Sequence, residues 1–163
     1  MTIKFNPDLT PREIILTGAF GGNYFAGDLD RLELDKWFEN IDARLYASEK
    51  YSLKTNKFKV RSGSSLEYWQ KSGWIHDEDP KGWFEWYCKY YHGRRHEDDE
   101  RQFRRWNNFC GVNGRWRNTI YKKIDVAKAE ISNCQHISPR IQQSLLHWGY
   151  LVNQKDYDLW KLK

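Results

Sequence analysis

The sequence predicts a mainly α protein, a compact single-domain helical bundle over residues 1–163 with one small β element in its N-terminal third. Three observations predict this fold. The length of 163 residues suits one domain. Mean hydropathy is low, at −0.92, but 17% of the residues are aromatic, so large rings can build the core. From residue 64 onward, helix-start signals and apolar residues at helical spacing recur.

Residues 1–63 form the less regular part. Thr10 and Glu13 have the spacing of a capping box, and Pro11 occupies the first helical position, so a short helix is expected over residues 14–16. Glycines 18, 21 and 22 then alternate with aromatic residues. They predict a turn held by its aromatic neighbours, with a phosphate-binding loop as the less specific alternative.

Two further elements are expected before residue 63. Leu34, Phe38, Ile41 and Leu45 fall at i, i+4, i+7 and i+11, which is the spacing of one helical face. Polar and apolar residues alternate over Lys57–Arg61. This alternation predicts a short, half-buried strand, the one β element of the fold.

Residues 64–163 form the helical part, rich in aromatic and basic residues. Each expected helix begins with a Ser or Asp cap, a capping box or a proline at the first helical position, or is marked by apolar residues at helical spacing. The expected starts are Ser64–Glu67, Asp79–Pro80, residue 98, residue 115 and Ser138–Pro139. Gly73 and Gly93 are expected to end the first two of these helices.

Positive charge is concentrated in residues 80–128. That segment holds twelve basic and six acidic residues, a net charge of +6, so the rest of the chain carries −1 of the overall +5. No acidic residue occurs from Arg101 to Ile124. Clustering of this kind is the electrostatic footprint of a protein that binds a polyanion.

Helical periodicity predicts where these basic side chains lie. In the helix near residues 98–110, Phe103, Trp106 and Cys110 would face the core and leave the arginines on the opposite face. The guanidinium fork suits bidentate contacts with phosphate. The candidate anion-binding residues are Arg94, Arg95, Arg101, Arg104, Arg105, Arg117 and Lys122. An ordinary solvated charged face is the alternative.

The aromatic run just before these arginines has two interpretations. Trp83, Trp86 and Tyr90 recur at helical spacing, a pattern that is usually core packing. The alternative is that these three rings are exposed and stack on bases, next to arginines that contact the phosphates. Gly93 would then end the helix and project Arg94 and Arg95 from its C-terminal end.

The sequence contains no motif for a defined reaction. Glu85, Asp98 and Asp99 are the carboxylates nearest the basic segment and the weak candidates for a general base; capping and charge neutralisation are their ordinary roles. Cys88, His92 and His96 repeat every four residues but lack the paired spacing of zinc motifs. We therefore predict no metal and no cofactor.

The compartment is predicted from what the sequence lacks. The three cysteines do not form a C-x-x-C pair or a disulfide framework, which is typical of reduced thiols. The first seven residues contain no apolar stretch of a signal peptide, and no run is long enough for a membrane span. A cytoplasmic protein that does not contact membranes is expected.

Residues 79–95, with the pattern Asp-Pro-x-Gly-Trp-Phe-x-Trp-Tyr followed by Gly-Arg-Arg, resemble a widespread family of small uncharacterised intracellular proteins. The resemblance extends to Gly18–Phe25, Gly73–Ile75 and the helix after Ser138, and so covers most of the chain. Glu85 departs from the family, which has glutamine there. The resemblance implies one integral domain and brings no established activity.

The leading hypothesis is a nucleic-acid-binding protein, for DNA or RNA, that uses its arginine-rich helical face and exposed aromatic rings. A second hypothesis is a small enzyme that acts on a phosphorylated or nucleotide-like substrate in an aromatic and arginine-lined pocket. A third is an adaptor or inhibitor that docks an acidic protein partner. A concave pocket would favour the second hypothesis, and a flat basic surface the first.

Overall fold

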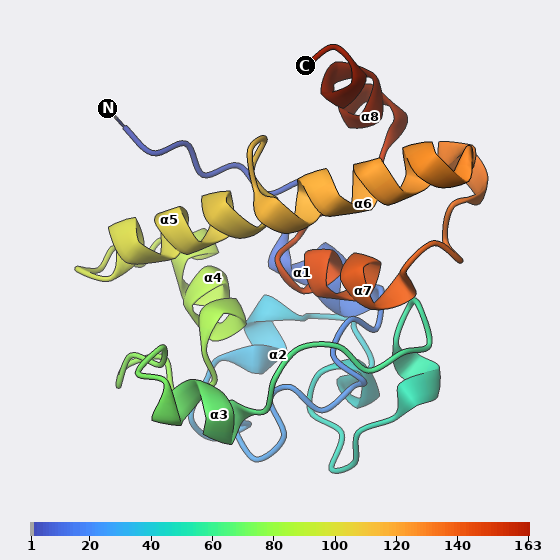
Figure 1. Cartoon of the computed structure of the whole chain (residues 1–163). Coiled ribbons are helices and arrows are strands. Elements are labelled where there is room, and N and C mark those ends of the chain that lie inside the picture. Colours follow the sequence, from blue (N-terminus) through green and yellow to red (C-terminus); the bar gives the residue numbers. More distant parts are fainter. Residues whose placement is uncertain (1) are drawn as a thin grey trace.

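A computed structural model describes residues 2–163; Met1, the first residue of the predicted domain, lies outside the described residues. The described chain is α-helical and contains no strand, as Figure 1 shows. Its α-helices are α1 (Pro11–Leu16), α2 (Leu34–Trp37), α3 (Leu66–Lys71), α4 (Trp83–Tyr91), α5 (Asp99–Cys110), α6 (Arg115–Ala127), α7 (Pro139–His147) and α8 (Gln154–Lys161). Short 3₁₀ turns occur at Ala43–Leu45, Leu53–Thr55 and Ile131–Asn133.

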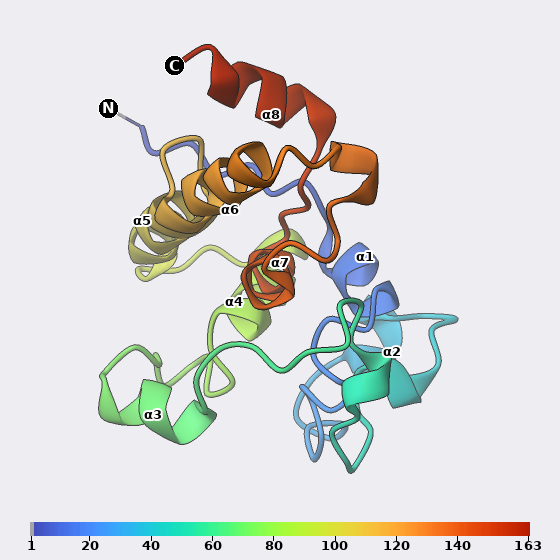
Figure 2. The same ribbon diagram turned by 45° about the vertical axis from the view of Figure 1, so that its right-hand side comes forward.

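The helices are arranged in layers. Helices α5 and α6 follow each other along one side of the molecule, and α8 lies outside them (Figures 1 and 2). Helices α4, α1 and α7 form the middle layer, and α2, α3 and the long loops of the N-terminal part lie on the opposite side. None of the helices in residues 2–163 is long and apolar enough to cross a membrane.

Several predicted helix starts are confirmed. Thr10 and Glu13 form a reciprocal capping box, in which the Glu13 N–H donates to Thr10 Oγ1 at 3.2 Å and the Thr10 N–H donates to Glu13 Oε2 at 2.7 Å. Helix α3 begins within the predicted range, but the Ser65 hydroxyl caps it by accepting from the Tyr68 N–H, in place of the capping box expected at Ser64–Glu67. Pro139 occupies the first turn of α7, as expected.

The predicted strand at Lys57–Arg61 is wrong. Lys59 has a φ of +54°, in the left-handed region, which reverses the chain at this point. The Phe58 N–H donates to Gln143 Oε1 at 3.1 Å, and the buried Asn56 amide donates to the Val60 carbonyl at 2.8 Å. The backbone groups that a sheet would need are therefore partly taken by side chains within a turn.

Two other expected helices begin or end elsewhere. The face that starts at Leu34 is buried through Ile41, but α2 stops at Trp37: the next residue, Phe38, has left the helical region, and Asn40 then adopts a left-handed φ of +62°. Asp79–Pro80 does not start a helix either. Helix α4 begins at Trp83, and the Asp79 carboxylate pairs with Lys89 on α4 and with Arg94 after it.

The glycine loop after α1 is a turn, as predicted. Gly18, Gly21 and Gly22 all have positive φ. A Cβ on Gly21 would lie 2.3 Å from the Tyr51 ring, so this position requires glycine. The aromatic packing of this loop brings Phe20 and Tyr24 against Phe84 of α4, with ring centroids 4.7 and 5.2 Å apart.

Large rings build the core, as the composition predicted. The buried hydrophobic residues form one cluster that draws on both the irregular N-terminal part and the helices after residue 64. Phe5 reaches into this cluster and contacts several rings of α4 and α5, among them Trp86 at 5.4 Å edge-to-face and Phe103 at 5.0 Å stacked. Edge-to-face and stacked aromatic pairs contribute about 0.5–1.5 kcal/mol each beyond their burial.

A buried ion network joins the two parts of the chain. Glu85 on α4 has no exposed surface, and Arg31 from the N-terminal loop donates to both of its carboxylate oxygens, at 2.5 and 3.0 Å. Lys89 Nζ lies 2.8 Å from the same carboxylate. A buried carboxylate is tolerated only when cations pair with it, so this network fixes α4 against the N-terminal loops.

The three cysteines are free and buried. Burial raises the pKa of the Cys88 and Cys110 thiols well above its ordinary value, and it raises that of Cys134 as well. All three therefore stay protonated at neutral pH.

Candidate functional site: a tryptophan pocket with unpaired guanidinium groups

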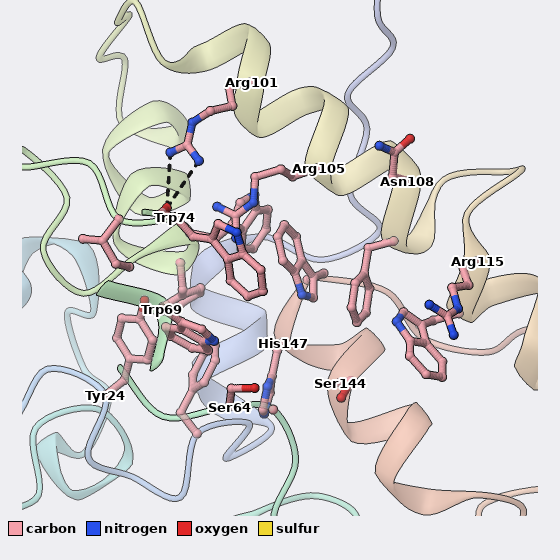
Figure 3. A pocket seen from close by; sticks show the side chains of 18 residues that line it. Tyr24, Ser64, Trp69, Trp74, Arg101, Arg105, Asn108, Arg115, Ser144 and His147 are labelled. Carbon is pink, nitrogen blue, oxygen red and sulfur yellow. Dashed lines mark hydrogen bonds between the residues drawn. The ribbon is translucent and has the colours of Figure 1, made fainter. Parts of the chain in front are cut away.

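A cavity of about 860 Å³ lies between α3, α5, α6 and α7, with α4 beneath it (Figure 3). Five of the nine tryptophans line it: Trp69, Trp74, Trp83, Trp116 and Trp148. We call this cavity the tryptophan pocket. Small-molecule sites typically occupy about 300–1,000 Å³ and are mostly apolar with a few polar groups.

The face of α5 that borders the pocket is set by helical spacing. Arg101, Arg105 and Asn108 fall at i, i+4 and i+7 and all line the pocket. Trp106 and Gln102, on the adjoining side of α5, are buried and hold the helix against the core. In Figure 3, Arg105 reaches from α5 toward the centre of the pocket, above His147 of α7.

Arg105 is the central charge of the pocket and has no carboxylate partner among residues 2–163. Its Nη1 donates to the side-chain oxygen of Gln102 at 2.9 Å, and its guanidinium lies 5.3 Å from the Trp148 ring centroid. Burial, together with the neighbouring charge of Arg101, lowers the pKa of Arg105 to about 10. The group is still cationic at neutral pH, so a positive charge stands partly desolvated against aromatic rings.

The other charged groups of the lining are also arginines. Arg101 is neutralised by Asp98, and its Nη atoms donate to the Trp74 carbonyl at 3.3 Å, as Figure 3 shows. Arg115 lies over the ring of Trp116 at 4.9 Å and, within the described chain, forms no ion pair. No aspartate or glutamate lines the pocket in the described chain. The pocket is therefore rich in donors and positive in charge.

The seven basic residues predicted to form one anion-binding surface do not gather on one. Four of them form ion pairs: Arg94–Asp79, Arg101–Asp98, Arg104–Glu100 and Arg117–Asp156. Arg95 lies 3.9 Å over the Tyr90 ring, and Lys122 is exposed on α6. The pairs with Asp98 and Glu100 lie at helical spacing on one segment, but those with Asp79 and Asp156 join separate elements and could not be read from spacing. Among these seven residues, only Arg105 combines a place in the pocket with the lack of an ion pair.

The predicted stacking rings are not exposed. Trp86 has no exposed surface and its indole N–H donates to Asp99 at 2.8 Å, so it belongs to the core. Trp83 is 6% exposed; it lines the pocket, and its buried indole N–H has no hydrogen-bond partner within residues 2–163. Tyr90 is half-buried beneath Arg95. The core interpretation of this helical face is the correct one.

The three candidate carboxylates have structural partners. Glu85 belongs to the buried network with Arg31. Asp99 accepts from Trp86 Nε1 and from the His96 N–H at 3.0 Å. Burial would raise the pKa of Asp98, but hydrogen bonds from Arg101 and Gln102 outweigh burial and lower it. None of the three lines the pocket, so the idea that one of them is a general base has no geometric basis.

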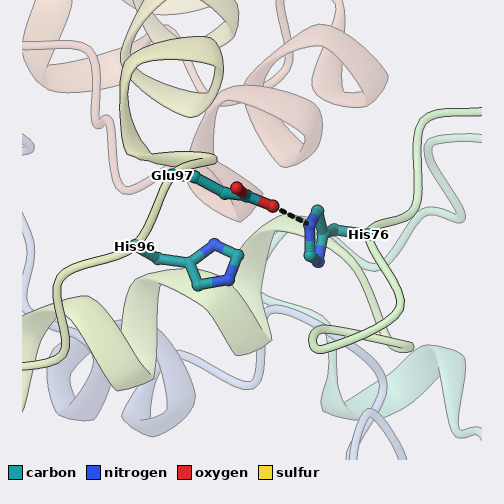
Figure 4. A group of neighbouring side chains, drawn as sticks. All are labelled: His76, His96 and Glu97. Carbon is teal, nitrogen blue, oxygen red and sulfur yellow. Dashed lines mark ion pairs between the residues drawn. The ribbon is translucent and has the colours of Figure 1, made fainter.

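A second polar cluster lies outside the pocket, where His76, His96 and Glu97 bring their side-chain N and O atoms within 4.8 Å of one another (Figure 4). Both histidine Nδ1 atoms accept backbone N–H groups at 3.2 Å, from Glu78 and Asp98. Each neutral ring therefore carries its proton on Nε2. His96 Nε2 then donates to Glu78 at 3.0 Å, so both ring nitrogens of His96 are engaged within the protein.

The evenly spaced set of Cys88, His92 and His96 does not come together. Cys88 is enclosed in the core, and the His92 ring stacks on Trp37 at 5.6 Å. His96 pairs with Glu78.

Sequence reasoning found only Trp83, Arg101 and Arg105 of the 18 residues that line the pocket. Trp69 and Trp74 on the α3 side, Trp148 and His147 at the end of α7, and Arg115 were not among the candidate residues. The high tryptophan count was the one available signal, and it does not say which indoles meet in a pocket.

Comparison with protein-family models, curated proteins and solved structures found no match for this chain. Any function must therefore be inferred from the geometry of the pocket.

Proposed function

We propose that this protein binds a small organic anion with an aromatic body, such as a nucleotide, in the tryptophan pocket. The proposal keeps the substrate class of the second sequence hypothesis and assigns no reaction. The volume of about 860 Å³ is large enough for a ligand of that size.

The observation that best supports this proposal is the environment of Arg105. A partly buried guanidinium normally contacts a carboxylate directly, whereas Arg105 contacts a neutral amide and an aromatic ring, and the neighbouring carboxylate, Asp98, is reached only through Gln102. An anionic oxygen bound at the remaining N–H groups of Arg105 would restore the interaction energy that burial removes. Hydrogen bonds between charged partners contribute about 1.5–3 kcal/mol each.

The tryptophans of the pocket support an aromatic ligand. Trp83 and Trp148 lie 4.7 Å apart on the inner side of the pocket, and Trp69 and Trp74 face them from the segment around α3. Stacking of a planar ring on an aromatic side chain contributes about 1–3 kcal/mol. Inorganic phosphate would occupy Arg105 and leave the part-exposed indoles of Trp69, Trp74 and Trp148 in contact with water, so an aromatic part of the ligand is favoured.

Titration of the protein with AMP, adenosine, indole-3-acetate and inorganic phosphate tests the proposal, with tryptophan fluorescence and calorimetry as readouts. We expect AMP or indole-3-acetate to bind more tightly than adenosine or phosphate. The change Arg105→Gln should weaken anion binding by roughly 10- to 100-fold, as the loss of one charge-assisted contact requires. Arg104→Gln is the matched control, because Arg104 is exposed and pairs with Glu100 outside the pocket.

Two results would overturn this function. One is no binding of any of the four compounds at millimolar concentration. The other is equal affinity of the wild type and Arg105→Gln. A single-stranded oligonucleotide that binds, and whose affinity falls with Lys122→Gln but not with Arg105→Gln, would favour the nucleic-acid hypothesis instead. Docking of an acidic protein partner stays a prediction, with no specific feature of the pocket behind it.

A further inference from the structure

His147 is the one aromatic nitrogen acceptor that the described residues place in a pocket whose other polar groups are mainly donors. It ends α7 and lines the tryptophan pocket, where it is partly exposed (Figure 3). Its ring stacks on Phe20 with centroids 4.7 Å apart, which fixes the plane of the imidazole. The three arginines and five indoles around the pocket can only donate hydrogen bonds.

The tautomer of His147 follows from its contacts. Its Nε2 lies 2.8 Å from the Ala19 carbonyl oxygen. Two acceptors at that distance would repel each other, so Nε2 carries the hydrogen and donates it. Gln143 Nε2 donates to the same oxygen at 2.6 Å and holds the carbonyl in place. The remaining ring nitrogen, Nδ1, therefore has the lone pair of a neutral imidazole.

Nδ1 has no hydrogen-bond partner among residues 2–163, whereas Nε2 is engaged with the backbone. Burial lowers the pKa of His147 to about 4, so the ring stays neutral at physiological pH and Nδ1 stays an acceptor. The groups that contact the ring, Ala19, Gln143 and Phe20, carry no charge that would change this state.

Resting on the proposed function, we infer that the aromatic ring of the ligand carries an N–H group that donates to His147 Nδ1, while its anionic group binds Arg105. The ligand class is therefore a nitrogen heterocycle with a ring N–H or amino group joined to a phosphate or carboxylate. Nucleotides and indole carboxylates share this chemistry. In Figure 3 the two recognising groups come from different helices, Arg105 from α5 above and His147 from α7 below. Both groups line the same pocket, which is the arrangement that a single ligand with these two functions requires.

Matched ligand pairs test this inference. AMP is compared with purine riboside 5′-monophosphate, which lacks only the amino group, and indole-3-acetate with benzofuran-3-acetate, which has oxygen in place of N–H. We expect the wild type to bind the donor-bearing member of at least one pair about tenfold more tightly, since an unmet acceptor in a protein site disfavours the analogue. The pair that shows the preference also tells a nucleotide ligand from a carboxylate.

The variant His147→Gln separates recognition from folding. A glutamine amide nitrogen can occupy the position of Nε2 and donate to Ala19, so the fold is retained, while the amide oxygen is displaced from the position of the Nδ1 acceptor. We expect His147→Gln to bind both members of the pair equally, with a melting temperature near that of the wild type. His147→Asn, which retains an acceptor near Nδ1 but loses the contact with Ala19, should keep the preference and melt earlier.

Each outcome distinguishes the two proposals. Equal binding of both pair members by the wild type, with dependence on Arg105 intact, overturns the role of His147 and leaves the anion pocket standing. A preference that persists in His147→Gln also overturns it. Loss of all binding in the wild type overturns the pocket and this inference together.

Discussion

The two sides of the tryptophan pocket are built differently. Trp83 and Phe84 of α4, on the inner side, are buried, and the same helix holds Glu85 in its ion network. The outer side is the segment 63–75 around α3, a helix with no buried residue. Gly63 and Gly73 at its ends have positive φ, and a Cβ there would meet almost nothing. The inner side therefore carries stability, and the outer side can contribute to binding at little cost to folding.

The largest expected effect on stability comes from removing a glutamate on the inner side. Glu85 on the inner side and Glu67 on the outer side are each paired with a lysine four residues later. Glu85→Ala on the inner side should lower the free energy of unfolding by about 3–5 kcal/mol, because Arg31 and Lys89 lose their buried partner. Glu67→Ala on α3 removes an exposed pair with Lys71 and should cost less than about 1 kcal/mol. Urea denaturation measures both. Similar losses would show that the two sides do not differ.

A second comparison uses one tryptophan from each side. Trp83→Ala should lower the free energy of unfolding by about 3–5 kcal/mol, since it empties a packed site beside Trp148 and Tyr87. Trp69→Ala should leave the denaturation midpoint almost unchanged and weaken AMP binding at least fivefold through lost stacking. Denaturation and calorimetry on the same samples check this. A large loss of stability in Trp69→Ala would contradict it.

These two comparisons show how far the sequence could predict the molecule. Helix existence after residue 64 was predictable because caps, prolines and apolar spacing are local. The turn that replaces the expected strand at Lys57–Arg61 could not be predicted, because the Phe58 N–H donates to Gln143, a residue far along the chain. Alternation alone cannot reveal such a partner.

The site was less predictable than the fold. Arg105 was among the candidate residues because it lies on the polar face of α5. Arg104 pairs with Glu100 one turn earlier on α5, whereas Arg105 donates to Gln102 on the same helix and packs against Trp148, a tertiary contact that helical spacing does not reveal. Trp148 meets Trp69 and Trp74 at the pocket only through the packing of two segments far apart in the sequence.

The smallest expected effect is a pH dependence of the folding stability that arises from His147. The pKa of His147 is about 4 in the folded chain and about 6.5 when unfolded, so the unfolded state binds a proton first as the pH falls. This contribution to stability is complete above pH 6.5 and is lost between pH 6.5 and 4, by up to about 3 kcal/mol.

Urea denaturation at pH 7.5 and pH 4.5 measures this loss. His147→Gln should reduce the difference between the two pH values, and His136→Gln, at an exposed position, should not. An unchanged difference in His147→Gln would show that the histidine titrates alike in both states.

The buried thiols give the chain an internal probe of its own opening. Cys88 lies on α4, Cys110 ends α5 and Cys134 follows the last 3₁₀ turn, and none is exposed or ionised in the folded state. A thiol-reactive dye can modify each of them only when the surrounding segment opens. Labelling rates in single-cysteine versions would therefore report local opening at three depths of the molecule, with and without a bound compound, and with no added reporter group.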